Sequence, residues 1–470
     1  MTRSLMRGGA FLAAATVLMA PSANAQGFGV YEQGACVMGR AGTGVASPCS
    51  DGSTIFFNPA NLTRTPDVIS GGGTLILPRG GFTNDLTGLR SDMLDKVRPV
   101  PNLYVVKGFP LEGGLDHLSV GVGVFVPYGL TTEWPDTSEA RFLGYRTDVR
   151  ALYVQPTAAV RFGQRFSVGA GLDINFAHLE LKQRADLSQL AVPGTDITFG
   201  NLGVATGTDF ADADLEANTT HVGFHVGLGV QVTDWLDVGA RYLSRQTVSF
   251  DDGSVKIAQV PTGLVVPAAL PGIPAGTPVD NLLAPQFTNG VLTDQSASTK
   301  LTMPDQFVAG VAVRPAQRLT LLSDVQYTHW KLFDSVSIAF EKLPTEVLHQ
   351  DNHDVWGFRL GGEFAATPGL TLRGGWYIHD GASADYAVVP NLPEGDRSSF
   401  TLGFGTRVGT GFRIDAAYQY IDQGDRRGRT VPLDLSVCPG GTPCPALVNQ
   451  NNGLYQFHAH LFGATFSYEF

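Results

Sequence analysis

Cysteine and histidine are the side chains of this sequence whose spacing could support redox, metal or hydrolytic chemistry. The four cysteines form two local pairs, Cys36 with Cys49 and Cys438 with Cys444. We expect each pair to be bridged by a disulfide in an oxidising compartment; the alternative is that the cysteines stay free and buried. No histidine lies at ligand spacing from either pair, so we expect no metal site.

Hydrolysis would need a serine, a histidine and an orienting polar group close together. His458 and His460 are available, but no nucleophile elbow of the G-x-S-x-G type stands out. Glycine pairs such as Gly121 with Gly123 are similar to parts of phosphate loops, but no helix follows them. We therefore expect no catalytic residues and no cofactor.

The first residues predict export. Arg3 and Arg7 precede a short apolar stretch, 8–20, and Ala23-Asn24-Ala25 has the small-x-small pattern of a cleavage site. The apolar stretch is too short to span a bilayer as a permanent helix. We expect a signal peptide over residues 1–25 and a mature chain in a compartment that permits disulfides.

The composition fits a β-rich protein with much apolar surface. Charged residues make up 16% of the 470 residues, below the typical value of about 25%, while aromatics reach 10% and glycine occurs 57 times. The formal net charge is −11 and no basic run reverses it, so we expect no nucleic-acid partner.

The elements that must position these residues are strands, because apolar side chains recur with a period of two. In the segment 118–126, aliphatic residues alternate with glycine, serine and one phenylalanine. Alternate residues of a strand point to opposite faces, so one face is continuously apolar. The alternation returns at 222–230, 356–363, 400–407 and 412–420, and in all about 14 such segments occur.

These segments suit a membrane better than a soluble sandwich. Their second face carries charged and amide side chains between glycines, as a polar lumen requires. Tyrosine and tryptophan, which favour the membrane interface, concentrate at segment ends. They are Tyr128, Trp134, Tyr242, Tyr327, Trp330, Tyr377, Tyr418 and Tyr420. Because lipid cannot satisfy an open sheet edge, such strands must close into a barrel.

The connections alternate between short and long, as they do in bacterial outer-membrane barrels. Tight turns are predicted near 162–167, 233–235, 315–318, 366–369 and 408–411, and long outer loops near 185–215, 256–298 and 424–453. The chain ends on Phe470, in register with an apolar stripe that starts at Phe462. Ending on an aromatic in this register resembles the C-terminal strand of such barrels, so we expect the bacterial outer membrane.

Residues 26–66 precede the first credible strand and have a different character. They are glycine-rich and lack alternation, and the adjacent aromatics of "IFFNPANL" (55–62) favour burial. Asn-Pro marks a turn, because proline fixes its own φ and restricts the residue before it. We expect 26–66 to form a hatch that plugs the lumen of an all-β barrel made by 67–470.

The segment "MGRAGTGVASPCSDGSTIFFNPANL" (38–62) resembles the N-terminal hatch of the FadL/TodX family of outer-membrane transporters for hydrophobic compounds. "YGLTTEW" (128–134), Thr147-Asp148, "LTMPDQFVAGVAV" (301–313) and "YTHW" (327–330) are similar to its later strands. The resemblance covers nearly the whole mature chain. It implies a 14-stranded antiparallel transmembrane β-barrel, in agreement with the count of alternating segments.

The resemblance also implies a function, the passive uptake of long-chain fatty acids or small aromatic hydrocarbons. The ligand would land in an apolar groove between outer loops, bind in the lumen, and leave sideways where the third strand is kinked. Pro127, Tyr128 and Gly129 match the kinked strand, and Phe28 matches an aromatic of the N-terminal tail that reaches the lumenal site. Asn58-Pro59-Ala60 match the hatch motif, with the expected role of holding the plug against the wall near the kink.

Two outer loops supply candidate groove residues. The stretch "VPTGLVVPAALPGIPAG" (260–276) is apolar and broken by prolines. Its candidate lining residues are Leu264, Val265, Val266 and Leu270, and those of the facing loop are Leu187, Leu190, Val192 and Phe199. The alternative is that these side chains pack on their neighbours and line no groove.

The basic residues leave the ligand's chemistry open. A carboxylate ligand would need a cation. Arg241, Arg359, Arg373 and Arg407 fall on predicted lumen faces, and Lys182 and Arg184 lie at an outer strand end. Such arginines more often pair with lumen acids such as Glu363 and Asp415.

Long-chain fatty acid uptake is the leading hypothesis. Its alternatives are uptake of aromatic hydrocarbons by the same route, an outer-membrane lipase or esterase, a water-filled porin, and an adhesive or structural barrel. The expected partners are the hydrophobic ligand, outer-membrane lipid and lipopolysaccharide, and the barrel-assembly machinery. We expect a monomer.

Overall fold

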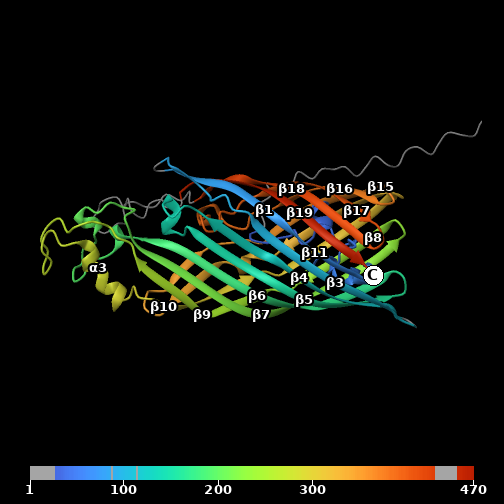
Figure 1. Ribbon diagram of the computed structural model, residues 1–470, viewed down its shortest axis with the longest axis horizontal. Helices are drawn as coiled ribbons and strands as arrows, with labels where there is room; N and C mark the ends of the chain where they lie inside the picture. Colours follow the sequence, from blue (N-terminus) through green and yellow to red (C-terminus); the bar gives the residue numbers. More distant parts are fainter. Residues whose placement is uncertain (1–26, 86–87, 113–114, 429–451) are drawn as a thin grey trace, which may run out of the picture.

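The structure is a computed structural model that describes residues 27–85, 88–112, 115–428 and 452–470. Within them, a single antiparallel sheet closes on itself (Figure 1), because β1 (Val68–Asn84) pairs with both β3 (Arg98–Pro110) and β19 (Gly453–Glu469). The barrel has 14 strands, which confirms the predicted fold class. The signal-peptide prediction and the second cysteine pair, Cys438 with Cys444, lie outside the described residues.

Several wall strands are interrupted by bends, so one span is often two consecutive elements. Between β3 and β19 the spans are β4 (Leu115–Glu133), β5 (Arg146–Phe162), β6 (Phe166–Asp186), β7 (Asp209–Thr233), β8 (Leu236–Leu243) with β9 (Gln246–Gln259), β10 (Gln295–Met303) with β11 (Gln306–Ala316), β12 (Leu319–Thr328) with β13 (Ser335–Phe340), β14 (Glu346–His349) with β15 (Val355–Thr367), β16 (Leu370–His379), β17 (Arg397–Val408) and β18 (Phe412–Gly428). A short β2 (Arg90–Asp92) pairs with β1.

The two faces of the wall differ as the period of two predicts. On β17, Phe400 and Leu402 are 62% and 66% exposed, whereas Thr401 between them is buried in the lumen. Large apolar side chains are exposed in this way on most spans, so the outer face of the barrel is an apolar belt. Separately, no helix among the described residues combines the length and the apolarity that a membrane crossing needs.

Long and short connections lie at opposite ends of the barrel, as Figure 1 shows with α3 (Val279–Thr288) at one end and the C-terminus near the other. Two of the three long connections are shorter than predicted, because the strands beside them run further: they span 187–208 and 260–294. Most of the third, predicted near 424–453, lies outside the described residues. Short 3-10 turns lie in connections at this end: η2 (Glu139–Phe142), η3 (Leu187–Gln189), η4 (Gly200–Leu202) and η6 (Asp385–Ala387). A further one, η5 (Trp330–Leu332), lies in the bend between β12 and β13.

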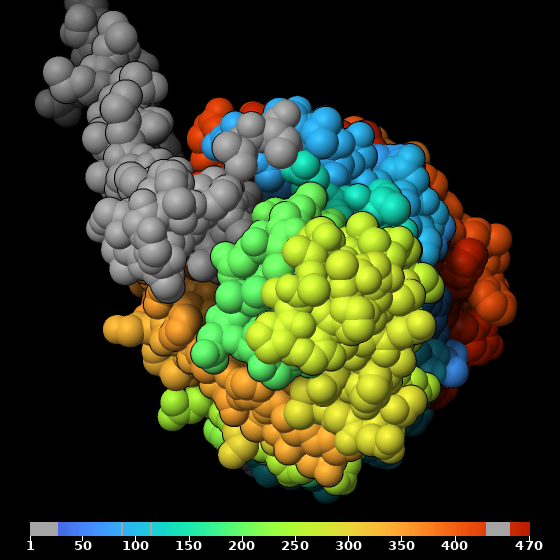
Figure 2. All heavy atoms as spheres, turned by 90° about the vertical axis from the view of Figure 1, so that its left-hand side faces the viewer, coloured from blue at the N-terminus to red at the C-terminus, as the bar shows by residue number. Residues whose placement is uncertain are grey.

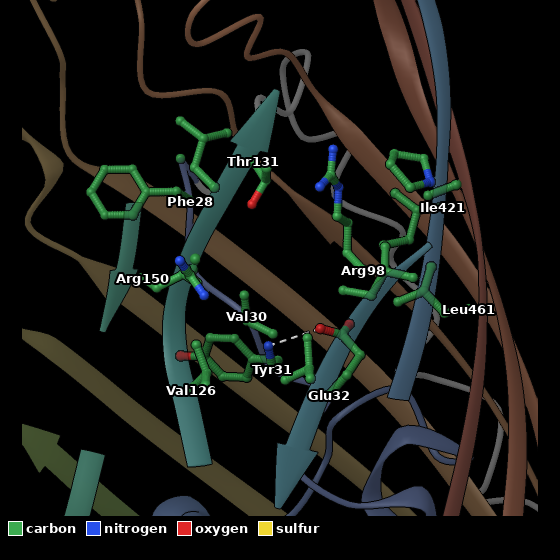
Figure 3. Close-up of a pocket in the computed structure, with 18 of the residues that line it drawn as sticks. Phe28, Val30, Tyr31, Glu32, Arg98, Val126, Thr131, Arg150, Ile421 and Leu461 are labelled. Carbon is green, nitrogen blue, oxygen red and sulfur yellow. Dashed lines mark hydrogen bonds between the residues drawn. The ribbon is translucent and has the colours of Figure 1, made fainter. Parts of the chain in front are cut away.

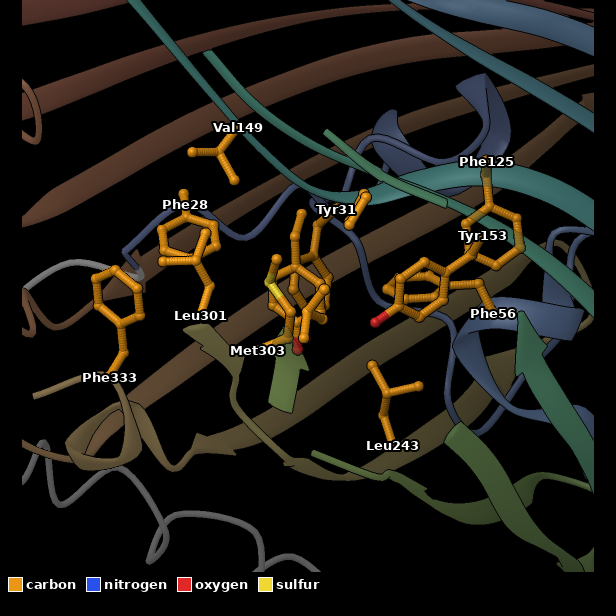
Figure 4. Close-up of a cluster of buried hydrophobic side chains, with 14 of the residues drawn as sticks. Phe28, Tyr31, Phe56, Phe125, Val149, Tyr153, Leu243, Leu301, Met303 and Phe333 are labelled. Atoms are coloured by element: carbon orange, nitrogen blue, oxygen red, sulfur yellow. The ribbon is translucent and has the colours of Figure 1, made fainter. Parts of the chain in front are cut away.

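The N-terminal segment fills the lumen. It contains only short helices, α1 (Ala35–Met38), α2 (Thr54–Phe57) and the 3-10 helix η1 (Pro59–Arg64), and almost all of its residues are buried. A disulfide joins Cys36 and Cys49, whose Cα atoms are 6.2 Å apart. Figure 4 shows part of the apolar cluster that this segment shares with the wall, with Phe56 near Phe125.

Candidate functional site

The barrel wall opens between β3 and β4. Hydrogen-bonded pairing between these strands ends at Leu103 and Val124, whereas β4 stays paired with β5 as far as Glu133. The register of β4 against β5 shifts between Phe125 and Tyr128, which is the mark of a β-bulge. A bulge bends its strand, and here the bend carries β4 away from β3 at the predicted kink.

The N-terminal tail, residues 27–33, lies along the edge of β4 that β3 leaves unpaired. The amide of Val30 donates to the carbonyl of Pro127 at 2.8 Å, and the amide of Gly129 donates to the carbonyl of Phe28 at 2.9 Å. The amide side chain of Gln33 donates to the carbonyl of Val126 at 2.6 Å. These bonds satisfy backbone groups that would otherwise be orphaned in the bend.

Aromatic packing fixes the start of the tail. The ring centroid of Phe28 lies 4.8 Å from that of Trp330, 5.3 Å from that of Phe333 and 6.1 Å from that of Tyr128, all edge to face. Figure 4 shows Phe28 beside Phe333 at one end of the buried cluster. The amide of Gly27 donates to the buried carboxylate of Glu394, which also accepts from two backbone amides of its own loop.

One cavity, of about 640 Å³, lies around the tail and the opening. From the lumen it is lined by residues such as Tyr31, Tyr377 and Leu461, and at the opening by Val100 and Leu130. It also reaches the lipid-facing side of the wall, where its lining residues are Arg150, Leu152, Phe176, His178 and Asn218. Figure 3 shows Val30, Tyr31 and Glu32 of the tail between Arg150 on one side and Arg98 on the other.

Most polar side chains of this cavity already have a hydrogen-bond or cation–π partner within the protein. Glu32 accepts from Gln419 at 2.9 Å, and the guanidinium of Arg359 lies 4.2 Å from the ring centroid of Tyr31. Burial raises the pKa of the Tyr31 hydroxyl, which stays neutral and donates to Gln306 at 2.7 Å. Arg397 is different: within the described residues it donates to the neutral Gln423 at 3.2 Å and forms no ion pair.

The hatch motif holds the plug to the wall at a different place from the one expected. Asn58 donates to the carbonyl of Leu228 on β7, and Pro59 packs where Gly169 of β6 and Gly227 of β7 leave room for it. These strands are not at the kink. The expected contact with the kink is made instead by the tail, because only an extended segment can pair with a strand edge.

The predicted loop residues come together, but mostly as a small core. Leu187, Val192, Phe199 and Val266 are almost fully buried in one cluster, and Leu190 and Leu270 pack against it. Leu264 and Val265 are exposed. Figure 2 shows the two loop segments side by side, in green and yellow, across this end of the barrel. In this conformation the alternative reading, loops that pack on each other, describes six of the eight side chains.

The arginines that were predicted to face the lumen differ in the groups they contact. Arg373 bridges Glu363 and Asp415, each at 2.7 Å. Arg241 donates to Gln306 and the carbonyl of Phe56, and Arg359 donates to the carbonyl of Ala41. Arg407 is exposed. At the outer end, Lys182 pairs with Asp214 and Arg184 with Asp136.

An aspartate, a histidine and a hydroxyl do lie in hydrogen-bond contact, but they are buried. Asp173 contacts Nδ1 of His225 at 2.5 Å, and Nε2 of His225 lies 3.0 Å from the hydroxyl of Thr157. All three side chains are buried in the wall, so the hydroxyl lacks the open approach that acyl transfer needs. His458 and His460 lie on the outer face, where His460 contacts the hydroxyl of Tyr418.

Sequence patterns did not reveal the pairing of the tail with β4, the role of Glu394, or Arg397. Backbone pairing leaves no trace in residue type, and Glu394 lies in an irregular loop. Arg397 could have been found, because it is in phase with Ser399 and Thr401 on the lumen face of β17. The predicted strand began three residues too late to include it.

A closed antiparallel barrel with an apolar outer belt, a plug made by its own N-terminal segment and a gap in its wall defines a class, the plugged outer-membrane transport barrels. The comparisons agree. The family model described as outer membrane protein transport protein (OMPP1/FadL/TodX) matches residues 16–470, and the chain belongs to this family. It is therefore an outer-membrane protein of a family that transports hydrophobic compounds.

Individual relatives are distant but span the whole chain. The chain is 24% identical to outer membrane protein P1 of Haemophilus influenzae, and 24% identical to the long-chain fatty acid transport protein of Escherichia coli K12; each alignment covers 98% of both chains. Among solved structures, a Pseudomonas aeruginosa FadL homologue superposes with a TM-score of 0.71 at 19% identity, covering 95% of this chain and 100% of that one. The Pseudomonas putida toluene transporter TodX gives 0.65 at 17% identity, covering 95% and 99%.

Proposed function

We propose that this protein takes up long-chain fatty acids passively, binds them in the lumen beside the N-terminal tail, and releases them sideways into the membrane between β3 and β4. The observation that carries the proposal is that one cavity is lined both by lumenal residues and by residues of the lipid-facing wall at the opening. A hydrophobic ligand gains free energy by leaving water for apolar surroundings, and lipid is its final sink. A sideways path avoids a water-filled pore altogether.

Apolar contacts connect the core of the outer loops with the lumenal cluster beside the cavity. Ile257 packs against both the loop core around Val266 and the lumenal cluster that contains Phe28. Between them the lumen presents apolar side chains such as Leu301 and Ile338. The loop residues would serve as the capture site after the loops move apart, because in the present arrangement most of them cover one another.

The chemistry of the cavity favours a fatty acid over a neutral hydrocarbon. Arg397 has no carboxylate partner within the described residues, and a fatty acid would supply one. Arg359 lies in the same cavity. A volume of about 640 Å³ is in the range of about 300–1,000 Å³ that ligand pockets occupy. An aromatic hydrocarbon is the second candidate, since the lining is otherwise largely apolar.

The tail would act as the gate, and the energies are compatible with that role. Its three hydrogen bonds to β4 contribute about 1.5–4.5 kcal/mol together, at about 0.5–1.5 kcal/mol each. Burial of Phe28 adds about 2–3 kcal/mol. The standard binding free energy of a ligand with micromolar affinity is about 8 kcal/mol, which is of the same size as this cost.

Gly129 offers the test, because it lies in the opening and its missing side chain can be added without strain. A Cβ there would make only ordinary contacts, 3.6 Å to Val126 and Val30. We expect Gly129→Trp to abolish most uptake of radiolabelled oleate while the barrel still folds. The matched control is Gly374→Trp, a lipid-facing glycine of β16 that is equally open. Normal uptake by Gly129→Trp would refute lateral exit.

A further inference from the structure

A row of polar side chains crosses the outer wall beside the opening. Gly129 of β4 pairs with Arg150 of β5, Arg150 pairs with His178 of β6, and His178 pairs with Asn218 of β7. Residues directly opposite one another on neighbouring strands lie on the same face of the sheet. The row therefore begins at the opening and runs away from it along the outside of the barrel.

This row stands at the border of the apolar belt. The next pair on the same face, two residues along each strand, is Leu152 with Phe176, and Phe176 is 47% exposed. The Arg150 side chain is 57% exposed and has one close carboxylate partner, Asp148, at 2.9 Å. His178 contacts the side-chain oxygen of Asn218 at 2.9 Å. The guanidinium of Arg150 and the side-chain nitrogen of Asn218 are thus the donors for an anion, with His178 holding the Asn218 amide in place, and they lie directly beside a surface for a hydrocarbon chain.

The row belongs to the same cavity as the lumenal site. Arg150, His178 and Asn218 line the cavity that also contains Tyr31 and Arg397. A ligand that passes through the gap in the wall meets these side chains as soon as it leaves the lumen.

We propose that Arg150, His178 and Asn218 form a headgroup station that receives the carboxylate of a long-chain acid as its hydrocarbon chain enters the membrane. The proposal rests on the lateral route proposed above and assigns it a ligand class, amphipathic monocarboxylates. A carboxylate cannot follow its chain into an apolar belt without losing its solvation. A guanidinium at the border binds it in a charge-assisted, two-pronged contact, while the chain lies along Leu152 and Phe176. A neutral ligand has no carboxylate and makes no charge-assisted contact with the headgroup station.

The test compares two ligands with the same chain, oleate and oleyl alcohol, in cells that lack any other protein of this family. We expect Arg150→Gln to lower the initial rate of oleate uptake about tenfold and to leave the alcohol unchanged. Arg150→Lys keeps a charge and should restore most of the oleate rate. Arg165→Gln removes an exposed arginine from the turn between β5 and β6, at the other end of the same strands, and should change neither rate. Asp148 keeps Arg146 as a partner at 3.7 Å when Arg150 is replaced.

Gly129→Trp separates failure of the station from failure of the route. If it lowers uptake of both ligands, the route stands; the station is then refuted if Arg150→Gln affects neither ligand or affects both equally. If Gly129→Trp affects the uptake of neither ligand, the lateral route is refuted, and so is the headgroup station, which depends on that route. Loss of oleate uptake alone in Arg150→Gln, with Gly129→Trp blocking both ligands, supports both proposals.

Discussion

Replacement of Asn58 is expected to loosen the hatch without unfolding the barrel. Its side-chain nitrogen donates to the carbonyls of Val45 at 2.7 Å and Leu228 at 2.8 Å, and its oxygen caps η1 by accepting from the amide of Ala60 at 3.1 Å. The side chain is fully buried. Asn58→Ala removes all three bonds at once.

The magnitude follows from the partners. Loss of a helix cap costs about 1 kcal/mol, and each lost amide bond costs about 1 kcal/mol. Asn58→Ala should therefore cost about 3 kcal/mol. Asn58→Ser keeps a capping oxygen and should cost about 2 kcal/mol. Asn61→Ala, which removes one bond to Val45 at 2.9 Å, should cost about 1 kcal/mol.

Hydrogen exchange of the η1 amides that follow Pro59, residues 60–64, in detergent-solubilised protein measures this local opening. We expect exchange about 100-fold faster in Asn58→Ala than in the parent, since about 1.4 kcal/mol corresponds to a factor of ten. The increase in exchange rate should be smaller in Asn58→Ser and smallest in Asn61→Ala. Amides of β17 and β18 should keep their protection. An unchanged η1, or equal loss of protection in the hatch and the wall, would refute the claim that Asn58 holds a separately opening plug.

Three further changes test other contacts. Cys36→Ser together with Cys49→Ser should lower the stability of the hatch by about 3 kcal/mol, because the bridge closes a loop of 13 residues; faster proteolysis near residue 45 would show it, and unchanged proteolysis would count against it. Val30→Cys with Gly129→Cys should allow an oxidant to lock the tail to β4, since a methyl of Val30 lies 3.6 Å from the Cβ position of residue 129; oleate uptake should stop and return on reduction, and uptake that persists in the locked form would exclude the tail as the gate. Arg397→Gln should weaken oleate binding about tenfold without affecting oleyl alcohol, measured with purified protein, and equal affinity loss for both ligands would mean that Arg397 serves the fold.

The barrel was predictable because its physics is repetitive. An apolar side chain at every second residue, as in Phe400 and Leu402, recurs on span after span, so errors in one segment do not change the conclusion. The buried character of Phe56 was also readable, since a large aromatic in a glycine-rich segment gains only from burial. The short turns followed from glycine and proline between alternating segments.

The site was less predictable, because it depends on contacts between distant segments. The kink at Pro127 could be expected from proline and glycine in a strand, but not that residues 28–30 would pair with it. The loop residues Leu187 and Val266 were correctly read as apolar, yet composition cannot tell a groove from a core. Asn58 was expected near the kink and lies instead against β6 and β7, because the glycines that receive Pro59 are there.

Photoaffinity labelling tests the central claim, lateral release between β3 and β4, most directly. Protein in outer-membrane vesicles would be incubated with a long-chain fatty acid that carries a diazirine on its chain, irradiated, digested and mapped by mass spectrometry. We expect adducts on both edges of the opening, at residues 98–101 and 129–132, and on the outer wall at Leu152 and Phe176. Adducts confined to the hatch and to the inner faces of β6 and β7, with the edges and the outer wall unlabelled, would contradict it.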